Sequence, residues 1–273
     1  MTEFFRLSGG GNDFLALAEP RRAPTAAQIR AWCARGLSLG ADGLFVLRRA
    51  PAGTRMDYFN ADGRPAALCI NGTRCAARLA FELEWAADEL VVETGAGPVP
   101  ARRSAANEVA LTLPAPATPA SQLTLQVDGT EIDGWQIVVG VPHFVVVWPR
   151  PLGEAPVADL GPPLRRHRSL GEAGANIDFV RFPAPGRLEI RTFERGVEAE
   201  TLACGTGVLA ATVIGLATGH LETPVRALTA GGFELSVDSA GPEHLSLAGD
   251  ARIVASGRLR PAAAKLPPPP AWT

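Results

Sequence analysis

Two segments of the sequence, half a chain length apart, share one pattern that limits what this chain can fold into. Cys69-Ile-Asn-Gly72 opens an apolar stretch that predicts a helix over Asn71 to Trp85, and Cys204-Gly-Thr-Gly207 opens another over Gly205 to Thr218. Each cysteine follows a strand-like run with a Phe beside a polar residue, Phe59-Asn60 and Phe193-Glu194. A helix that is apolar nearly all round belongs in a protein interior. The pattern therefore predicts a duplicated unit, in which strands surround a central buried helix.

The rest of the chain fits an α+β protein divided near its middle. Short alternating or β-branched runs such as Glu89–Glu93 and Phe144–Trp148, separated by Gly, Pro and Asp, are typical of strands. The stretch from Leu113 to Ser121 has no period and is rich in Pro and Ala, as a linker is. One amphipathic helix is predicted from Thr25, its N-cap, to Arg35, with Gly36 as its stop.

Composition narrows the class of partner. The 273 residues carry a net charge of -2, which does not indicate the excess of positive charge typical of proteins that bind nucleic acid or an anionic membrane. A small-molecule partner is therefore favoured. The segment Met1–Arg6 lacks a signal-peptide pattern, so we expect a cytoplasmic protein with its four cysteines as free thiols. The single lysine, Lys265, stands beside a proline run, which excludes a pyridoxal mechanism that needs a core lysine. We expect no cofactor.

The two helix-start cysteines suggest a chemistry. A cysteine ahead of a helix lies near unpaired backbone N–H groups and the positive end of the helix dipole, a setting that lowers the pKa of the thiol. The same amides can hold a carboxylate. Inverting a stereocentre requires a proton to leave one face and another to reach the opposite face. One cysteine per domain, Cys69 and Cys204, would meet that requirement.

The alternative for each cysteine is plain packing, because free cysteine is among the most buried residue types. We assign Cys75, inside the first apolar helix, and Cys33, beside Trp32, to packing. The four histidines show no metal-ligand spacing, and we expect no metal site.

Several linked motifs resemble the diaminopimelate epimerases, in the superfamily of cofactor-independent racemases that includes proline racemase. The resemblance covers most of the chain in order. Its motifs are Ser8-Gly-Gly-Gly-Asn12-Asp13-Phe14, Phe59-Asn60-Ala-Asp-Gly63, Cys69-Ile-Asn71-Gly72-Thr-Arg74-Cys75, Gly140-Val-Pro-His143, Gly174-Ala-Asn176-Ile-Asp-Phe179, Phe193-Glu194-Arg195-Gly196 and Glu200-Thr201-Leu-Ala-Cys204-Gly-Thr-Gly207.

The resemblance implies interconversion of LL- and meso-diaminopimelate, in the formation of lysine and peptidoglycan precursors. Cys69 and Cys204 would be the acid/base pair. The amides of Ile70, Asn71, Gly205 and Thr206 would bind the reacting carboxylate. The family also implies that the distal carboxylate and the amino groups contact Asn12, Asn60, Asn176, Glu194 and Arg195. From the residues alone, Asn60 and Asn176 could instead serve a turn and a strand end, and Arg195 could be a surface charge.

The family further implies two similar domains, each a curved, mostly antiparallel sheet or barrel around a buried helix, with the active site in the cleft between them. We expect domains at 1–117 and 118–250, the strand 251–260 completing the first, a flexible tail over 261–273, and a homodimer.

Three departures from the family pattern leave the substrate open. Ile70 replaces a glycine and puts a β-branched side chain at the rim of the carboxylate site, while Val141 and Ser8 stand where Asn and His are common. His143 keeps the family's Pro-His position and is a further candidate for contact with the site. The alternatives are a racemase of a histidine- or proline-type amino acid with the same two thiols, and a protein of this fold without thiol chemistry.

Overall fold

The computed structural model describes residues 2–51, 53–241 and 243–264, and it divides the chain into two compact units. The first unit contains residues 1–111 and 250–273, and the second contains Thr112–Gly249. Of the predicted tail over 261–273, Pro261–Ala264 forms the short 3-10 helix η3, which lies against α1 (Ala26–Cys33), and the remainder lies outside the described residues. No helix of the described ranges is long and apolar enough to cross a membrane.

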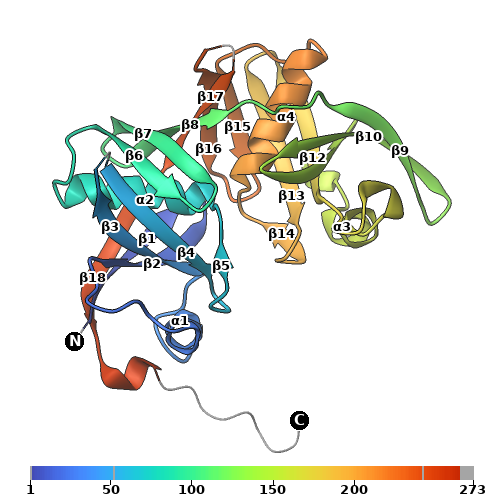
Figure 1. Ribbon diagram of the computed structural model, residues 1–273. Helices are drawn as coiled ribbons and strands as arrows, with labels where there is room; N and C mark the ends of the chain where they lie inside the picture. Colours follow the sequence, from blue (N-terminus) through green and yellow to red (C-terminus); the bar gives the residue numbers. More distant parts are fainter. Residues whose placement is uncertain (1, 52, 242, 265–273) are drawn as a thin grey trace, which may run out of the picture. The chain divides into compact units, whose positions relative to one another are not determined.

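In the first unit, strands surround the central helix α2 (Ile70–Glu82), as Figure 1 shows. The pairings are β18–β1, β1–β2, β3–β4, β4–β5, β6–β7 and β7–β8, all antiparallel, and β2–β3 and β4–β6, both parallel. The strand bounds are β1 (Thr2–Gly9), β2 (Asn12–Ala18), β3 (Gly43–Ala50), β4 (Gly53–Asn60), β5 (Pro65–Ala66), β6 (Glu89–Thr94), β7 (Gly97–Ala105), β8 (Glu108–Pro114) and β18 (Arg252–Leu259).

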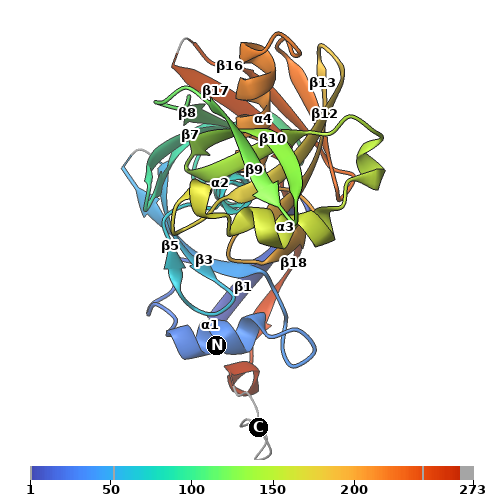
Figure 2. The ribbon, with the colours of Figure 1, turned by 90° about the vertical axis from the view of Figure 1, so that its right-hand side faces the viewer.

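The second unit repeats this arrangement around α4 (Gly205–Ala217), which Figures 1 and 2 show against its own strands. Antiparallel pairs are β9–β10, β10–β11, β12–β13, β13–β14, β15–β16 and β16–β17, and β11–β12 and β13–β15 are parallel. The strand bounds are β9 (Ser121–Val127), β10 (Thr130–Val139), β11 (Val141–Val147), β12 (Asn176–Ala184), β13 (Arg187–Glu194), β14 (Ala199–Thr201), β15 (Val225–Thr229), β16 (Glu234–Ser239) and β17 (His244–Asp250).

The order of pairings is the same in both units, so β10 corresponds to β1, β13 to β4 and α4 to α2. This confirms the predicted duplication. Over the described residues neither set of strands closes into a barrel, so of the two expected forms the open sheet is the one found.

The remaining helices cover the parallel crossovers. Helix α1 connects β2 to β3. Thr25 is its N-cap, as predicted, and forms a capping box with Gln28, in which each side chain accepts a hydrogen bond from the backbone N–H of the other residue. Its counterpart α3 (Val157–Arg165) connects β11 to β12, between the short 3-10 turns η1 (Leu152–Glu154) and η2 (Arg168–Leu170). Sequence reasoning missed α3, because Pro162 and Pro163 inside it are residues that normally end a helix.

Candidate active site

Each unit places one cysteine at the start of its central helix. Cys69 is the N-cap of α2, with an extended backbone, and its Sγ accepts the Gly72 N–H at 3.4 Å. Cys204 is the N-cap of α4, also with an extended backbone, and its Sγ lies 3.3 Å from the Thr206 hydroxyl. Both thiols therefore lie at the positive end of a 13-residue helix, beside its first amides.

Burial distinguishes the two thiols. Cys69 is partly exposed, whereas Cys204 is only 7% exposed. Burial raises the pKa of Cys204 well above its ordinary value, and the charges of Glu194 and Asp178 raise it further, against the hydrogen bonds from Thr206 and Gly207. The expectation that a helix start lowers the pKa of its cysteine is therefore wrong for Cys204, because desolvation and two carboxylates outweigh the local amides.

Asn176 connects Cys204 to the neighbouring strand end. Its Nδ2 lies 3.9 Å from the Cys204 Sγ, and its Oδ1 accepts the backbone N–H of Arg195 at 2.8 Å. Because Asn176 begins β12 and Glu194 ends the adjacent β13, one side chain positions both the thiol and the turn that carries Arg195.

Two further residues of the predicted set, Asn60 and Glu194, lie at strand ends, and Arg195 follows Glu194 directly. Asn60 ends β4 and is exposed, in the place that Glu194 takes at the end of β13. Arg195 is partly exposed, and within the described part of the chain its guanidinium has no ion pair or hydrogen bond. A guanidinium in this state can pair with a carboxylate through two parallel hydrogen bonds.

In the first unit, Asn12 and Asn71 form one chain of hydrogen bonds. Asn71 Nδ2 donates to Asn12 Oδ1 at 2.7 Å, and Asn12 Nδ2 donates to Asp42 at 3.0 Å. Asp42 is in turn paired with Arg35 at 2.7 Å. The side chain of Asn71 is therefore fixed, and its backbone amide is at the helix start, where it was predicted to bind a carboxylate.

The amides that were predicted to bind the reacting carboxylate come from equivalent places in the two units. Ile70 and Asn71 are the first residues of α2, and Gly205 and Thr206 are the first of α4. The Ile70 side chain, which the sequence predicts at the rim of the carboxylate site, is only 6% exposed.

A buried polar cluster lies against the first turn of α4. His143 Nδ1 is 2.6 Å from Asp178 Oδ2, Thr192 donates to Asp178 Oδ1 at 2.7 Å, and all three side chains are buried. A Cβ on Gly207 would collide with Asp178 Oδ1, so the carboxylate touches the helix directly. Sequence reasoning named His143 but missed Asp178. A carboxylate inside the apolar β12 was the available signal.

Cys75 and Cys33 are buried, in agreement with a packing role. Burial raises the pKa of Cys75 above its ordinary value and that of Cys33 to about 12. Unlike Cys69 and Cys204, neither thiol lies at a helix start, because Cys75 is inside α2 and Cys33 ends α1.

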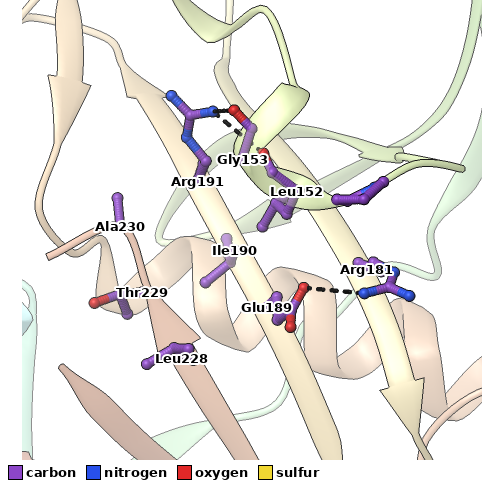
Figure 3. A pocket seen from close by; sticks show the side chains of 10 residues that line it. Leu152, Gly153, Arg181, Glu189, Ile190, Arg191, Leu228, Thr229 and Ala230 are labelled. Atoms are coloured by element: carbon purple, nitrogen blue, oxygen red, sulfur yellow. Dashed lines mark hydrogen bonds and ion pairs between the residues drawn. The ribbon is translucent and has the colours of Figure 1, made fainter. Parts of the chain in front are cut away.

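A separate pocket in the second unit carries none of the predicted site residues. It has a volume of about 350 Å³ and lies beside β13 and β15 (Figure 3). Its Arg181 pairs with Glu189, and Arg191 is held by Glu200 and by carbonyls of Leu152, Gly153 and Ala155. We assign it no role in the chemistry.

Known structures share this fold. A putative phenazine biosynthesis PhzC/PhzF protein from Clostridium difficile matches with a TM-score of 0.72 at 13% identity, over 95% of this chain and 100% of that one. A probable proline racemase from Agrobacterium radiobacter K84 matches with a TM-score of 0.70 at 15% identity, over 97% of this chain and 96% of the other. At these identities the likeness concerns the fold alone.

Sequence comparison is more specific. The family model for diaminopimelate epimerase matches residues 4–113 and 136–254. The diaminopimelate epimerase of Aquifex aeolicus is 35% identical over 94% of this chain and 97% of its own length, and that of Methanothrix thermoacetophila is 36% identical over 93% and 95%. Since the family model spans most of the chain and these relatives align over nearly their whole length, the protein belongs to the diaminopimelate epimerase family.

Proposed function

We propose that this protein interconverts LL- and meso-diaminopimelate by inverting one α-carbon, with Cys69 and Cys204 as the acid/base pair and without a cofactor. The observation that carries the proposal is the repeated helix start, which puts a cysteine at the N-terminus of each central helix in a member of this family. The reaction would serve the formation of lysine and peptidoglycan precursors.

In the proposed reaction, one cysteine acts as thiolate and removes the α-proton, while the other donates a proton to the opposite face. Both helix starts must therefore approach the same substrate. The roles exchange with the direction of the reaction, so the free enzyme needs one thiolate and one thiol. Because burial and two carboxylates raise the pKa of Cys204, we assign the resting thiol to Cys204 and the resting thiolate to Cys69.

Charge develops on the α-carboxylate as the α-proton leaves. The amides of Ile70 and Asn71, with those of Gly205 and Thr206, would hold that carboxylate and stabilise the added charge. Such donors are already fixed in place by their helices, which removes the cost of orienting them during the reaction.

The distal end of diaminopimelate carries a second carboxylate and a second ammonium group. Arg195 would pair with the carboxylate, and Glu194 and the amide oxygens of Asn12, Asn60 and Asn176 would accept from ammonium groups. This arrangement requires a substrate with two charged ends.

The test is proton exchange in deuterium oxide. Purified protein incubated with LL- or meso-diaminopimelate, without added pyridoxal phosphate or metal, should place deuterium at the α-carbon and interconvert the isomers. Cys69→Ala and Cys204→Ala should each lose interconversion, whereas Cys33→Ala, which alters a buried cysteine remote from both helix starts in the sequence, is the matched control. Full activity in both active-site variants, or a requirement for either cofactor, would refute the mechanism.

One observation supports a second candidate, a racemase of a histidine- or proline-type amino acid. Asn12 begins β2, but Val141 begins the corresponding strand β11, so the second unit lacks an amide where the first has one. A substrate panel of the two diaminopimelate isomers, histidine and proline decides between the candidates. The cytoplasmic location and the homodimer expected from the sequence remain predictions.

A further inference from the structure

The turn that carries Arg195 is held by a carboxylate of the turn itself. This turn joins β13 to β14, and Glu198 Oε1 accepts the backbone N–H of Gly196 at 3.1 Å. The Glu198 N–H donates to the Glu194 carbonyl at 2.8 Å. The Arg195 N–H donates to Asn176 Oδ1 at 2.8 Å. The backbone on both sides of Arg195 is therefore fixed by hydrogen bonds.

Two arginines at the end of α3 hold the same carboxylate. Arg165 Nε donates to Glu198 Oε1 at 2.8 Å, and Arg166 Nη2 donates to Glu198 Oε2 at 2.7 Å. Helix α3 contacts both β13 and β14, beside which Figure 1 shows it. The Gly196 N–H, followed by the two arginines, lowers the pKa of Glu198, so the carboxylate is ionised near neutral pH.

Arg165 is itself fixed against the loop that leads into β12. Its side chain is 17% exposed, and its Nη1 donates to the Ala173 carbonyl at 3.4 Å. Its own carbonyl accepts the Ala175 N–H at 3.2 Å. Since Asn176 follows directly, one arginine connects the two segments that supply Asn176 and Arg195.

The backbone of Glu198 has a conformation that few side chains adopt. Its φ is 59°, in the left-handed region, where glycine, asparagine and aspartate are the usual residues. Another residue persists there only where surrounding contacts compensate for the strain. The hydrogen bonds of the Glu198 carboxylate supply such contacts, so the shape of the turn depends on this side chain.

The corresponding turn of the first unit is held differently. It joins β4 to β5 after Asn60, and Arg30 of α1 donates to its Asp62 carbonyl at 3.2 Å. Among the residues that the structure describes, the Asp62 carboxylate pairs with Arg64 of its own turn and not with α1. Ion pairs between the turn carboxylate and the crossover helix are thus a feature of the turn that carries Arg195.

The same contacts leave Arg195 available for a ligand. Both oxygens of the Glu198 carboxylate already accept from other donors, and across the described ranges the Arg195 guanidinium has no ion pair. An arginine that is held in place but not neutralised by its own turn can pair with a carboxylate from outside.

We propose that Glu198, held by Arg165 and Arg166, is a positioning residue that orders the turn and so places Arg195 for the distal carboxylate of the substrate. The part that concerns the substrate rests on the proposed function, whereas the ordering of the turn does not.

The test combines amide hydrogen exchange, followed by peptide mass mapping, with steady-state kinetics of the full chain. Glu198→Gln keeps the size of the side chain and removes its charge. Glu234→Gln is the matched control, because Glu234 also lies between two arginines, Arg187 and Arg226, each at 3.0 Å. It begins β16 of the same unit, a strand that carries none of the predicted site residues.

In Glu198→Gln, the peptide that contains residues 195–199 should exchange its amide hydrogens about fivefold faster than in the wild type, because the Gly196 N–H loses a charged acceptor. KM for diaminopimelate should rise about three- to tenfold, with a smaller change in kcat, because binding must then order Arg195. Glu234→Gln should change neither quantity.

A double variant separates positioning from a general loss of structure. In an Arg195→Met protein, Glu198→Gln should not raise KM further, because Glu198 acts through Arg195. A general loss of structure would raise KM in both backgrounds.

Unchanged exchange in a folded Glu198→Gln protein overturns the ordering of the turn. An unchanged KM, or a further rise of KM in the Arg195→Met background, overturns the connection to Arg195. If exchange follows the expectation but the wild type does not interconvert diaminopimelate, the proposed function fails and the role of Glu198 in ordering the turn stands.

Discussion

Gly207→Ala tests whether the polar cluster under α4 is as rigid as its contacts indicate. Gly207 lies in the first turn of α4, and a Cβ there would collide with Asp178 Oδ1 and come within 3.2 Å of Thr192 Oγ1. Asp178 has no room to retreat, because it is fully buried and held by His143 at 2.6 Å and Thr192 at 2.7 Å.

The magnitude follows from opposing effects. Replacing glycine by alanine in a helix stabilises it by about 1 kcal/mol. Overpacking costs about 1–3 kcal/mol, and weakening the hydrogen bond from Thr192 costs about 1 kcal/mol more. The net expectation is a destabilisation of about 2 kcal/mol, which for a chain of this size is a Tm lower by about 4–8 °C.

The matched control is Gly72→Ala, the corresponding position in the first turn of α2. Its Cβ would lie 3.4 Å from the Cys69 Cβ and 3.6 Å from Phe14, which is ordinary contact. Thermal unfolding by circular dichroism should therefore show a Tm for Gly72→Ala at or slightly above that of the wild type. A Gly207→Ala protein as stable as the wild type, or more stable, would refute the argument that Asp178 is held rigidly against α4.

Three further predictions concern charge. Because the Glu194 carboxylate contributes to raising the pKa of Cys204 after burial, Glu194→Gln should speed alkylation of Cys204 at pH 8; an unchanged rate contradicts this. The pKa of Asp13 is lowered because Arg35, with Arg6, outweighs burial, so its ionised form stabilises the fold above about pH 3.9 and that stability is lost on acidification. Arg35→Gln should lower the Tm at pH 7, and the gap to the wild type should close toward pH 3; a gap independent of pH would argue against it. Arg195→Met should raise KM for diaminopimelate about ten- to hundredfold, with a smaller change in Arg195→Lys; equal KM values would remove Arg195 from the binding site.

The sequence was sufficient to predict the duplicated architecture because the pattern that indicates it lies within short segments of the chain. A cysteine, a glycine three residues on and an apolar run mark a helix start, and both such helices are found within three residues of their predicted bounds. The pairing order of the strands was not available from this signal, since it depends on contacts between residues far apart in the chain. The local sequence pattern also did not predict α3, because this helix contains two prolines.

The predicted site residues are found where the motifs indicated, at strand ends and helix starts, but their partners were not predictable. Asn12 and Asn71 are 59 positions apart and meet through one hydrogen bond. Asp178 reaches His143 from 35 positions away. Contacts between residues so far apart produce no repeated spacing in the sequence. A motif can therefore identify the residue types of the site, but not the hydrogen bonds that orient their side chains.

The two helix starts have the same backbone and different electrostatics, and this difference bears on the mechanism. Cys69 is partly exposed, whereas Cys204 is buried, and the carboxylates of Glu194 and Asp178 raise the pKa of the Cys204 thiol beyond the effect of burial. A reaction that needs one thiolate and one thiol before substrate binds would be hindered by two identical environments, because both cysteines would then favour the same protonation state. In the mechanism that we propose, the duplicated fold supplies equivalent positions for the two thiols, and the greater burial of Cys204 favours the protonated form of its thiol.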